Sequence, residues 1–231
     1  MRIGRPPHNW SITPSQAIVV QKKLASAIRR EGEVRNTGLV AGLDAAFTAD
    51  KKHCIGGVVL WNTHDNMVVE RHTAFRKLHF PYIPGLLSFR EAPALIAALR
   101  ELRTVPDLII CDGQGIAHPR RLGIASHIGV ITDLPTIGCA KSRLVGEYRE
   151  PGPERGSASP LLHKNELVGI VLRTRDKVKP VFVSVGHKIE LDIARRIILD
   201  CAVGFRLPEP TRLADHLVAE RKKKILLKSK D

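Results

Sequence analysis

The sequence predicts a mixed α/β fold in which helices flank a single sheet. Three β-like segments follow one another early in the chain, and helical and strand-like segments alternate after them. This order is typical of a mixed sheet with helices packed on its faces. The chain has 231 residues, 43% of them hydrophobic, so it can bury a sizeable core, and we expect one domain over residues 1–231.

The first third of the chain is predicted to form one helix and three strands. Thr13 followed by Gln16 resembles a capping box, and apolar residues recur at helical spacing as far as Glu31. The strand-like segments that follow are 38–47, 55–61 and 67–76. The polar stretch 62–66 suits a hairpin turn between the last two strands.

The rest of the chain alternates between helix and strand. The Pro- and Gly-rich stretch 82–88 is predicted to be a loop, and Ser88 is expected to cap the next helix, with Glu91 as its capping-box partner. That helix should extend to about Arg103. The remaining predicted elements are strands at 107–111, 136–139, 167–173 and 180–185, a helix at 190–203 and a polar loop at 151–160.

The chain is strongly basic, with 37 Lys and Arg against 23 Asp and Glu and a net charge of +14. This balance favours a polyanionic partner, above all a nucleic acid, although a basic surface on a soluble protein explains it equally well. Six basic residues lie in 221–230, within a tail that is expected to begin at about residue 217. This tail either aids solubility or contacts nucleic acid.

The four cysteines predict neither a zinc site nor a disulfide framework. No two of Cys54, Cys111, Cys139 and Cys201 stand close together in the chain. Cys111 and Cys139 end apolar runs, so we expect both to be small buried hydrophobic residues. The sequence has no evident signal peptide and no apolar run of 18 residues, so we expect a cytoplasmic protein with no membrane partner.

Four acidic residues are candidates for a metal site. Asp44 interrupts an apolar strand, where an unpaired carboxylate is costly, unless it faces solvent from an antiparallel strand. Asp112 ends the apolar run 108–111, and ligands of α/β sheets bind at such strand ends, although Asp also commonly starts a turn. A helix cap explains Glu91 equally well, and a solvated helix face explains Asp215. Together these acids suit Mg²⁺ or Mn²⁺, which prefer carboxylate oxygens.

Four blocks of the sequence resemble those of the endonuclease V family, in the same order and spacing. They are PYIPGLLSFRE at 81–91, DGQGIAHPRRLG at 112–123 with ASH at 125–127, CAKSRL at 139–144 and LPEPTRLAD at 207–215. The resemblance covers most of the chain. It implies an RNase H-like fold, which is a mixed sheet flanked by helices, and a nuclease that uses Mg²⁺, with Mn²⁺ as a substitute.

The resemblance also implies roles for single residues. The catalytic, metal-binding acids of the family correspond to Asp44, Glu91 and Asp112, and a fourth metal position corresponds to Asp215, although His216 is adjacent. The remaining catalytic positions correspond to Lys141, beside the scissile phosphate, and to His118. The alternative for His118 is a loop histidine that only braces Asp112.

Two further groups of residues are implied to contact the substrate. Residues Pro81, Tyr82, Ile83 and Pro84 resemble the family's strand-separating wedge, and an aromatic ring between prolines can fill the gap that an extruded base leaves. The alternative for Tyr82 is ordinary packing at a loop. The base pocket is expected to comprise Gly85, Leu87, Gly113, Ile124 and Leu144.

The implied reaction is hydrolysis of the second phosphodiester bond 3′ to a deaminated base, chiefly deoxyinosine, during DNA repair. The products carry a 3′-hydroxyl and a 5′-phosphate. One alternative is an endoribonuclease specific for inosine in RNA, and another is a nucleic-acid-binding module without catalysis. The presence of all four acids and Lys141 argues against the second alternative. We expect the protein to act as a monomer.

Overall fold

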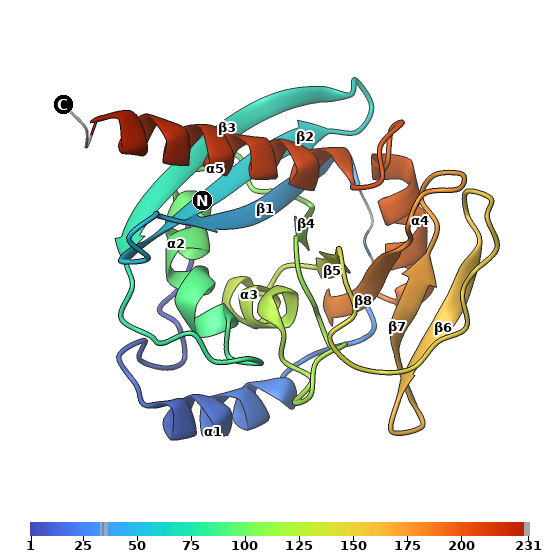
Figure 1. The fold of residues 1–231 in the computed structure, drawn as a ribbon, viewed down its shortest axis with the longest axis horizontal. Helices are drawn as coiled ribbons and strands as arrows, with labels where there is room; N and C mark the ends of the chain where they lie inside the picture. The colour runs from blue at the N-terminus through green and yellow to red at the C-terminus, as the bar shows by residue number, and fades with distance from the viewer. Residues whose placement is uncertain (33, 35–36, 229–231) are drawn as a thin grey trace.

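A mixed sheet of eight strands forms the centre of the structure, a computed structural model that describes residues 1–32, 34 and 37–228 (Figure 1). The strands are β1 (Leu39–Phe47), β2 (His53–Asn62), β3 (Met67–Lys77), β4 (Leu108–Cys111), β5 (Thr136–Ala140), β6 (Ala158–His163), β7 (Glu166–Leu172) and β8 (Val181–His187). Their order across the sheet is β3-β2-β1-β4-β5-β8-β7-β6. Strand β4 pairs in parallel with β1 and β5, and the other pairs are antiparallel. The predicted mixed α/β fold is therefore confirmed.

Helices cover both faces of this sheet. They are α1 (Pro14–Ala25), α2 (Ser88–Arg100), α3 (Ile124–Thr132), α4 (Leu191–Cys201) and α5 (Glu209–Lys228). Helices α2 and α3 pack with β1, β2 and β4 in one hydrophobic cluster, and α4 packs with the alternate residues of β4 in another. Helix α5 crosses β1 and β2 (Figure 1). No helix in the described part of the chain is long and apolar enough to cross a membrane.

Two adjacent glycines in β2 allow helices to approach the sheet from both sides. A Cβ atom added at Gly56 would lie 2.4 Å from the carbonyl carbon of Ala94 in α2, and one added at Gly57 would lie 2.5 Å from Cγ1 of Val218 in α5. Successive residues of a strand point to opposite faces. Helices α2 and α5 therefore lie on opposite faces of the sheet, and neither close approach leaves room for a side chain.

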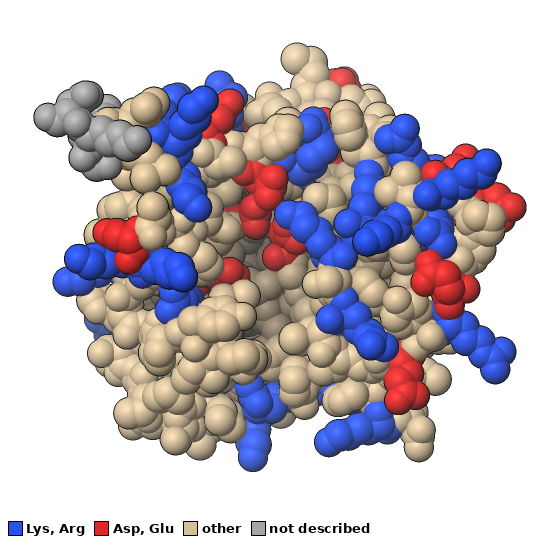
Figure 2. Space-filling model, in the orientation of Figure 1, with Lys and Arg blue, Asp and Glu red and all other residues tan. Residues whose placement is uncertain are grey.

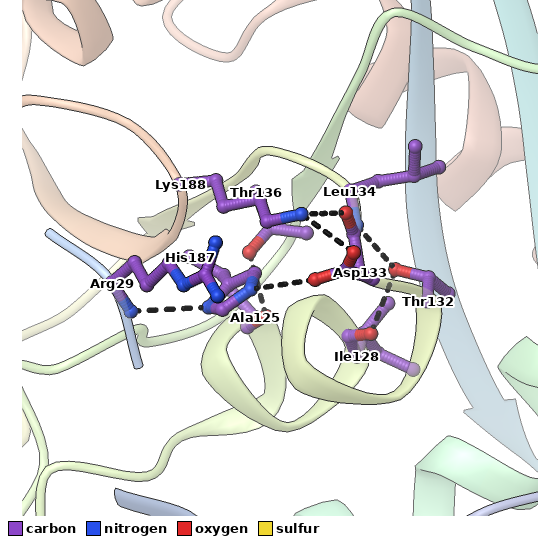
Figure 3. A network of polar contacts seen from close by, with 9 residues as sticks. All are labelled: Arg29, Ala125, Ile128, Thr132, Asp133, Leu134, Thr136, His187 and Lys188. Atoms are coloured by element: carbon purple, nitrogen blue, oxygen red, sulfur yellow. Dashed lines mark hydrogen bonds and ion pairs between the residues drawn. The ribbon is translucent and has the colours of Figure 1, made fainter. Parts of the chain in front are cut away.

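The first helix is shorter than the sequence predicts. The capping box of Thr13 and Gln16 is present, but the helix ends at Ala25 and not near Glu31. The chain beyond it is held by long-range hydrogen bonds instead (Figure 3): the Arg29 amide donates to Nδ1 of His187 (3.3 Å). The Lys188 amide donates back to the Arg29 carbonyl (2.7 Å). These tertiary bonds outweigh the local helical preference.

The other end of the same network fixes the turn after α3 (Figure 3). Asp133 adopts the left-handed conformation, with φ of 57°, and its carboxylate lies 2.6 Å from Nζ of Lys188 and 3.4 Å from Nε2 of His187. The Thr136 hydroxyl donates to the Ala125 carbonyl at 2.9 Å. The start of β5, the end of β8 and helix α3 are thereby connected.

Helix α3 and strand β6 contain two corrections to the predicted elements. The sequence of α3, IASHIGVIT, is apolar on nearly every side because the helix is buried, so it shows no amphipathic period, and its isoleucines favour strands. Strand β6 includes Pro160, which ended the predicted polar loop. Because β6 is an edge strand, it tolerates a proline.

The start of α2 contains a third correction. The N-cap is Leu87, which has no capping side chain, and Ser88 is the first helical residue. The buried hydroxyl of Ser88 lies 3.1 Å from Nδ1 of His127 in α3. A tertiary contact therefore replaces the predicted cap, and Glu91 is left without its expected capping partner.

The basic tail continues α5. The helix extends to Lys228, and Arg221, Lys223 and Lys224 are exposed on it. Residues 229–231 of the predicted tail lie outside the described residues. All four cysteines are buried and have free thiols, as predicted for Cys111 and Cys139.

Candidate active site

Three carboxylates from three different elements meet at one point beside the sheet. Asp44 lies in β1, Asp112 directly follows β4, and Asp215 lies in α5. One oxygen of each lies within 4.8 Å of the others, and all three side chains are half-buried. The neighbouring His216 is exposed, with Nδ1 3.5 Å from Nη1 of Arg212. Of the two adjacent candidates, Asp215 is therefore the residue that joins the acids.

The parallel register of β1 and β4 brings the first two acids together. Leu43 is the partner of Cys111, and the Asp112 amide donates to the Leu43 carbonyl at 3.0 Å. The next residue of each strand, Asp44 and Asp112, therefore lies at the same level of the sheet. Asp112 follows the carboxyl end of β4, which is where α/β sheets place ligand sites, and Asp44 lies beside it within β1.

The third acid depends on how closely α5 packs on β1. Gly42 precedes Asp44 by two residues and so points to the same face. A Cβ atom added at Gly42 would lie 2.1 Å from the carbonyl carbon of Pro210, in the first turn of α5. This contact brings Asp215, 1.4 turns further along the helix, to the two strand acids.

Burial and mutual repulsion raise the pKa of several of these acids. Burial, and then the charge of Asp112, raises the pKa of Asp44 to about 8. Burial also raises the pKa of Asp112, although Lys141 opposes this shift. Glu91 lies nearby in the first turn of α2, and burial followed by the charges of Asp44 and Asp112 raises its pKa to about 8. Carboxylates that destabilise one another in this way are stabilised by a bound cation.

The ammonium group of Lys141 forms ion pairs with two of these acids. Lys141 follows β5 directly, and its Nζ atom lies 2.5 Å from Oδ2 of Asp112 and 3.2 Å from Oδ1 of Asp215. Burial lowers the pKa of Lys141, but its two ion pairs outweigh burial and the net shift is upward. The side chain therefore stays positively charged at the edge of the acid cluster.

A pocket of about 390 Å³ lies beside the acids, and Glu91, Asp112 and Lys141 contribute to its wall. Figure 2 shows acidic side chains at the centre of this face next to a hollow, with Lys and Arg around them. The structure brings three of the four predicted wedge residues and all five predicted base-pocket residues to this wall. They are Tyr82, Ile83, Pro84, Gly85, Leu87, Gly113, Ile124 and Leu144.

The aromatic ring of the predicted wedge projects into solvent. Tyr82 is 69% exposed, so its ring is not packed in the core. Pro81, which is also exposed, lies outside the pocket wall, whereas Pro84 is part of it. The two prolines restrict the backbone on both sides of the ring.

The carbonyl oxygen of Gly85 anchors this loop. It accepts hydrogen bonds from Nε2 of Gln21 (2.9 Å), Nε2 of His118 (3.0 Å) and Nη2 of Arg120 (2.7 Å). Gln21 comes from α1, is fully buried, and accepts a further bond from Nε of Arg120. Gly85 has φ of 76°, which favours glycine. Sequence reasoning missed Gln21 and Arg120, because neither residue type nor spacing points to a shared acceptor.

His118 faces this loop and not the acids. Its Nδ1 atom accepts the Arg120 amide N–H at 3.2 Å, so the ring proton is on Nε2, which donates to Gly85. Burial, and then the charge of Arg120, lowers the pKa of His118 to about 4. The neutral ring therefore braces the loop at Gly85, and the alternative in which it braces Asp112 does not match these contacts.

Comparisons with known proteins identify the family of this chain. Residues 22–216 match the family model described as Endonuclease V. An Endonuclease V of Nostoc sp. is 49% identical over 216 residues, which cover 93% of this chain and 98% of that protein. The crystal structure of Endonuclease V from Streptomyces avermitilis has 44% identity and a TM-score of 0.90, and the match covers 97% of this chain and 100% of that one.

A more distant relative was solved with nucleic acid. It is the Endonuclease V of Ciona intestinalis, in complex with a 24mer DNA that contains an inosine followed by a ribo-adenosine. Its identity is 28% and its TM-score 0.80, and the match covers 91% of this chain and 98% of that one. Because the family match spans most of the chain and includes all three converging carboxylates, the chain belongs to the Endonuclease V family, and it is a nuclease and not a binding module without catalysis.

Proposed function

We propose that the protein is a Mg²⁺-dependent endonuclease that recognises deaminated bases in DNA, chiefly deoxyinosine, and acts in DNA repair. It hydrolyses the second phosphodiester bond on the 3′ side of the base. The observation that carries this proposal is the meeting of Asp44, Asp112 and Asp215 beside a pocket of about 390 Å³. The inosine-containing DNA bound to the Ciona intestinalis relative supports the choice of base.

The acid cluster suits Mg²⁺, with Mn²⁺ as a substitute. All the available ligand atoms are carboxylate oxygens, which hard divalent cations prefer. Asp44, Asp112 and Asp215 would hold the ion, with Glu91 close by. When bound, such an ion polarises a phosphate oxygen and makes a coordinated water more acidic.

Lys141 is placed to stabilise the phosphate group during hydrolysis. Its ammonium group lies between Asp112 and Asp215, so it is fixed at the edge of the site and remains charged. From there it can donate to a non-bridging phosphate oxygen as negative charge develops.

The pocket supplies selectivity for the base, and Tyr82 supplies access to it. Hypoxanthine lacks the exocyclic amine of guanine, so a close-fitting wall can exclude guanine. It carries a carbonyl where adenine carries an amine, and a backbone N–H beside Gly85 or Gly113 would favour that carbonyl. The exposed ring of Tyr82 would fill the gap in the base stack after extrusion.

Removal of the Tyr82 ring is expected to affect duplex substrate most. Tyr82→Ala should slow nicking of an inosine-containing duplex by about ten-fold or more, because a few kcal/mol of unstacking is no longer compensated. A single strand has less stacking to disrupt, so its nicking should change little. The measurement is the single-turnover rate on both substrates, with Tyr82→Phe as the control that keeps the ring. Equal losses on the two substrates would show that Tyr82 is not a wedge.

The anchor at Gly85 is expected to position the wedge loop. Gln21→Met removes a donor and an acceptor from a buried cluster, so we expect a loss of about 1–3 kcal/mol of stability and a larger fall in nicking of duplex than of single strand. Gln16→Met is the matched control, because Gln16 caps the same helix and its loss costs a comparable stability, about 1 kcal/mol. If both variants change the duplex-to-single-strand ratio equally, the effect is one of stability alone.

An endoribonuclease specific for inosine in RNA is the second candidate. The DNA in the Ciona intestinalis complex carries a ribonucleotide, adenosine, after the inosine, and this observation supports the second candidate. Matched DNA and RNA strands with one inosine each, incubated with and without Mg²⁺ and mapped to the nucleotide, separate the two candidates. Cleavage of DNA at the second bond 3′ to inosine supports our proposal, and cleavage of RNA alone supports the second candidate. Binding of both strands without Mg²⁺-dependent nicking contradicts both.

A further inference from the structure

A second cavity, of about 710 Å³, lies next to the wedge loop and helix α2, and it is lined by other residues than the base pocket. Ser88 and Glu91 of α2 line the base pocket, whereas Phe89, Arg90 and Pro93 line this cavity. We call it the basic groove and define it by its charged or titratable wall residues, which are Arg5, Arg76, Lys77, His79, Arg90 and Arg100.

The positive charge of the basic groove is not neutralised by the described part of the chain. Its wall contains no Asp or Glu. None of its five Lys and Arg side chains forms an ion pair with a described acidic residue. Such a concentration of unpaired cations attracts a polyanion.

The position of the basic groove relates it to the substrate. Phe80 lies in its wall and directly precedes the wedge residues Pro81 and Tyr82. Arg90 holds this end of the groove in place, since its Nη1 atom donates to the Phe80 carbonyl at 2.7 Å. A strand that passes the wedge can therefore enter the groove without leaving the protein surface.

The length and floor of the groove also suit one strand of nucleic acid. Its wall follows α2 from Phe89 to Arg100, which is about 17 Å at 1.5 Å per residue. One strand of a duplex carries a phosphate about every 3.4 Å, so roughly five phosphates fit along this wall. The half-buried ring of Trp10 and the buried ring of Phe89 provide an apolar floor between the cations.

We propose that the basic groove binds the sugar-phosphate backbone of the substrate strand segment that leaves the wedge. The proposal rests on the proposed function only in so far as the substrate is a nucleic acid. These contacts carry no base information, so the groove holds the flank of the substrate while the pocket reads the base.

The test removes three exposed cations of the groove that take no part in the acid site. Arg5→Gln, Arg76→Gln and Lys77→Gln are combined, and the matched control combines Arg175→Gln, Lys177→Gln and Lys179→Gln, which removes the same charge from the exposed residues between β7 and β8. Affinity for an inosine-containing duplex is measured without divalent cation over a salt series. The slope of log affinity against log salt should become less negative by about 2–3 in the groove variant, since each lost phosphate contact contributes about 0.9.

Shortened duplexes locate the contact. When the flank on one side of the inosine is removed, the parent and the groove variant should bind alike, and removal of the other flank should leave their difference intact. A groove variant that matches the control variant on every duplex overturns the proposal. A loss of affinity that is the same whichever flank is removed also overturns it. Because binding is measured without metal, a parent protein that binds but never nicks would contradict the proposed function and leave this proposal standing.

Discussion

Asp44→Asn and Asp112→Asn are each expected to reduce Mg²⁺-dependent nicking by at least about a thousand-fold, which corresponds to the loss of about 4 kcal/mol of metal-derived stabilisation in the transition state. Both side chains belong to the cluster whose oxygens lie within 4.8 Å of one another. Either substitution replaces one of the three carboxylates by a neutral amide, and a hard divalent cation is held less tightly when an anionic ligand is lost. The measurement is the single-turnover nicking rate on an inosine-containing duplex over a range of Mg²⁺ concentrations.

The same substitutions should not destabilise the metal-free protein. Asp44 and Asp112 are half-buried and repel each other, so loss of one charge removes an unfavourable interaction. In Asp112→Asn, Lys141 loses one ion pair but keeps its partner Asp215. We expect the metal-free Tm to stay the same or rise, and the increase in Tm on addition of Mg²⁺ to be lost. Asp200→Asn, on the exposed side of α4, is the control and should behave as the parent. Substantial Mg²⁺-dependent nicking by either variant would refute the assignment of these acids.

Gly113→Val is expected to lower nicking at inosine by about a hundred-fold, while affinity for undamaged duplex stays nearly unchanged. A Cβ atom at this position would lie 2.5 Å from Cγ2 of Ile124, which lines the base pocket. A valine must therefore push Ile124 into the space that the base would occupy, and overpacking of this kind costs about 1–3 kcal/mol. Binding to plain duplex depends on phosphate contacts elsewhere and should keep its dependence on salt.

Two further variants separate pocket shape from general damage. Gly4→Val is the control, because a Cβ atom at Gly4 has no neighbour within 4 Å. Adding Ile124→Ala to Gly113→Val makes room for the valine side chain and should recover part of the lost Tm, since the backbone at φ of 156° still disfavours a valine. The double variant should not recover the parent's preference for inosine. If Gly113→Val nicks inosine substrate at the parent rate, the base pocket lies elsewhere.

Local pattern in the sequence predicted most of the fold. The strands at 38–47, 55–61 and 67–76 correspond to β1, β2 and β3, because alternation and β-branched residues mark strands locally. Helix α3 was missed because burial on nearly all sides removes the amphipathic period that identifies a helix. The Ser88 cap was wrong because its hydroxyl bonds to His127, 39 residues away, and not to its own helix.

Local sequence features also identify the candidate residues of the site, whereas the packing of distant segments governs how these residues meet. A carboxylate in an apolar strand or at a strand end is conspicuous locally, and Asp44 and Asp112 were identified in this way. That they lie together depends on the parallel register of β1 and β4, and the choice of Asp215 over His216 depends on the packing of α5 against Gly42.

The anchor of the wedge loop contains residues that the sequence does not mark as candidates at all. Gln21 and Arg120 are ordinary polar residues in the sequence, yet both donate to the carbonyl of Gly85. Gln21 lies 64 residues from Gly85 and 99 residues from Arg120. Periodicity and capping report interactions between residues that are neighbours along the chain, whereas hydrogen bonds over such separations form only when packing of the hydrophobic core brings α1, the loop and the segment after β4 together.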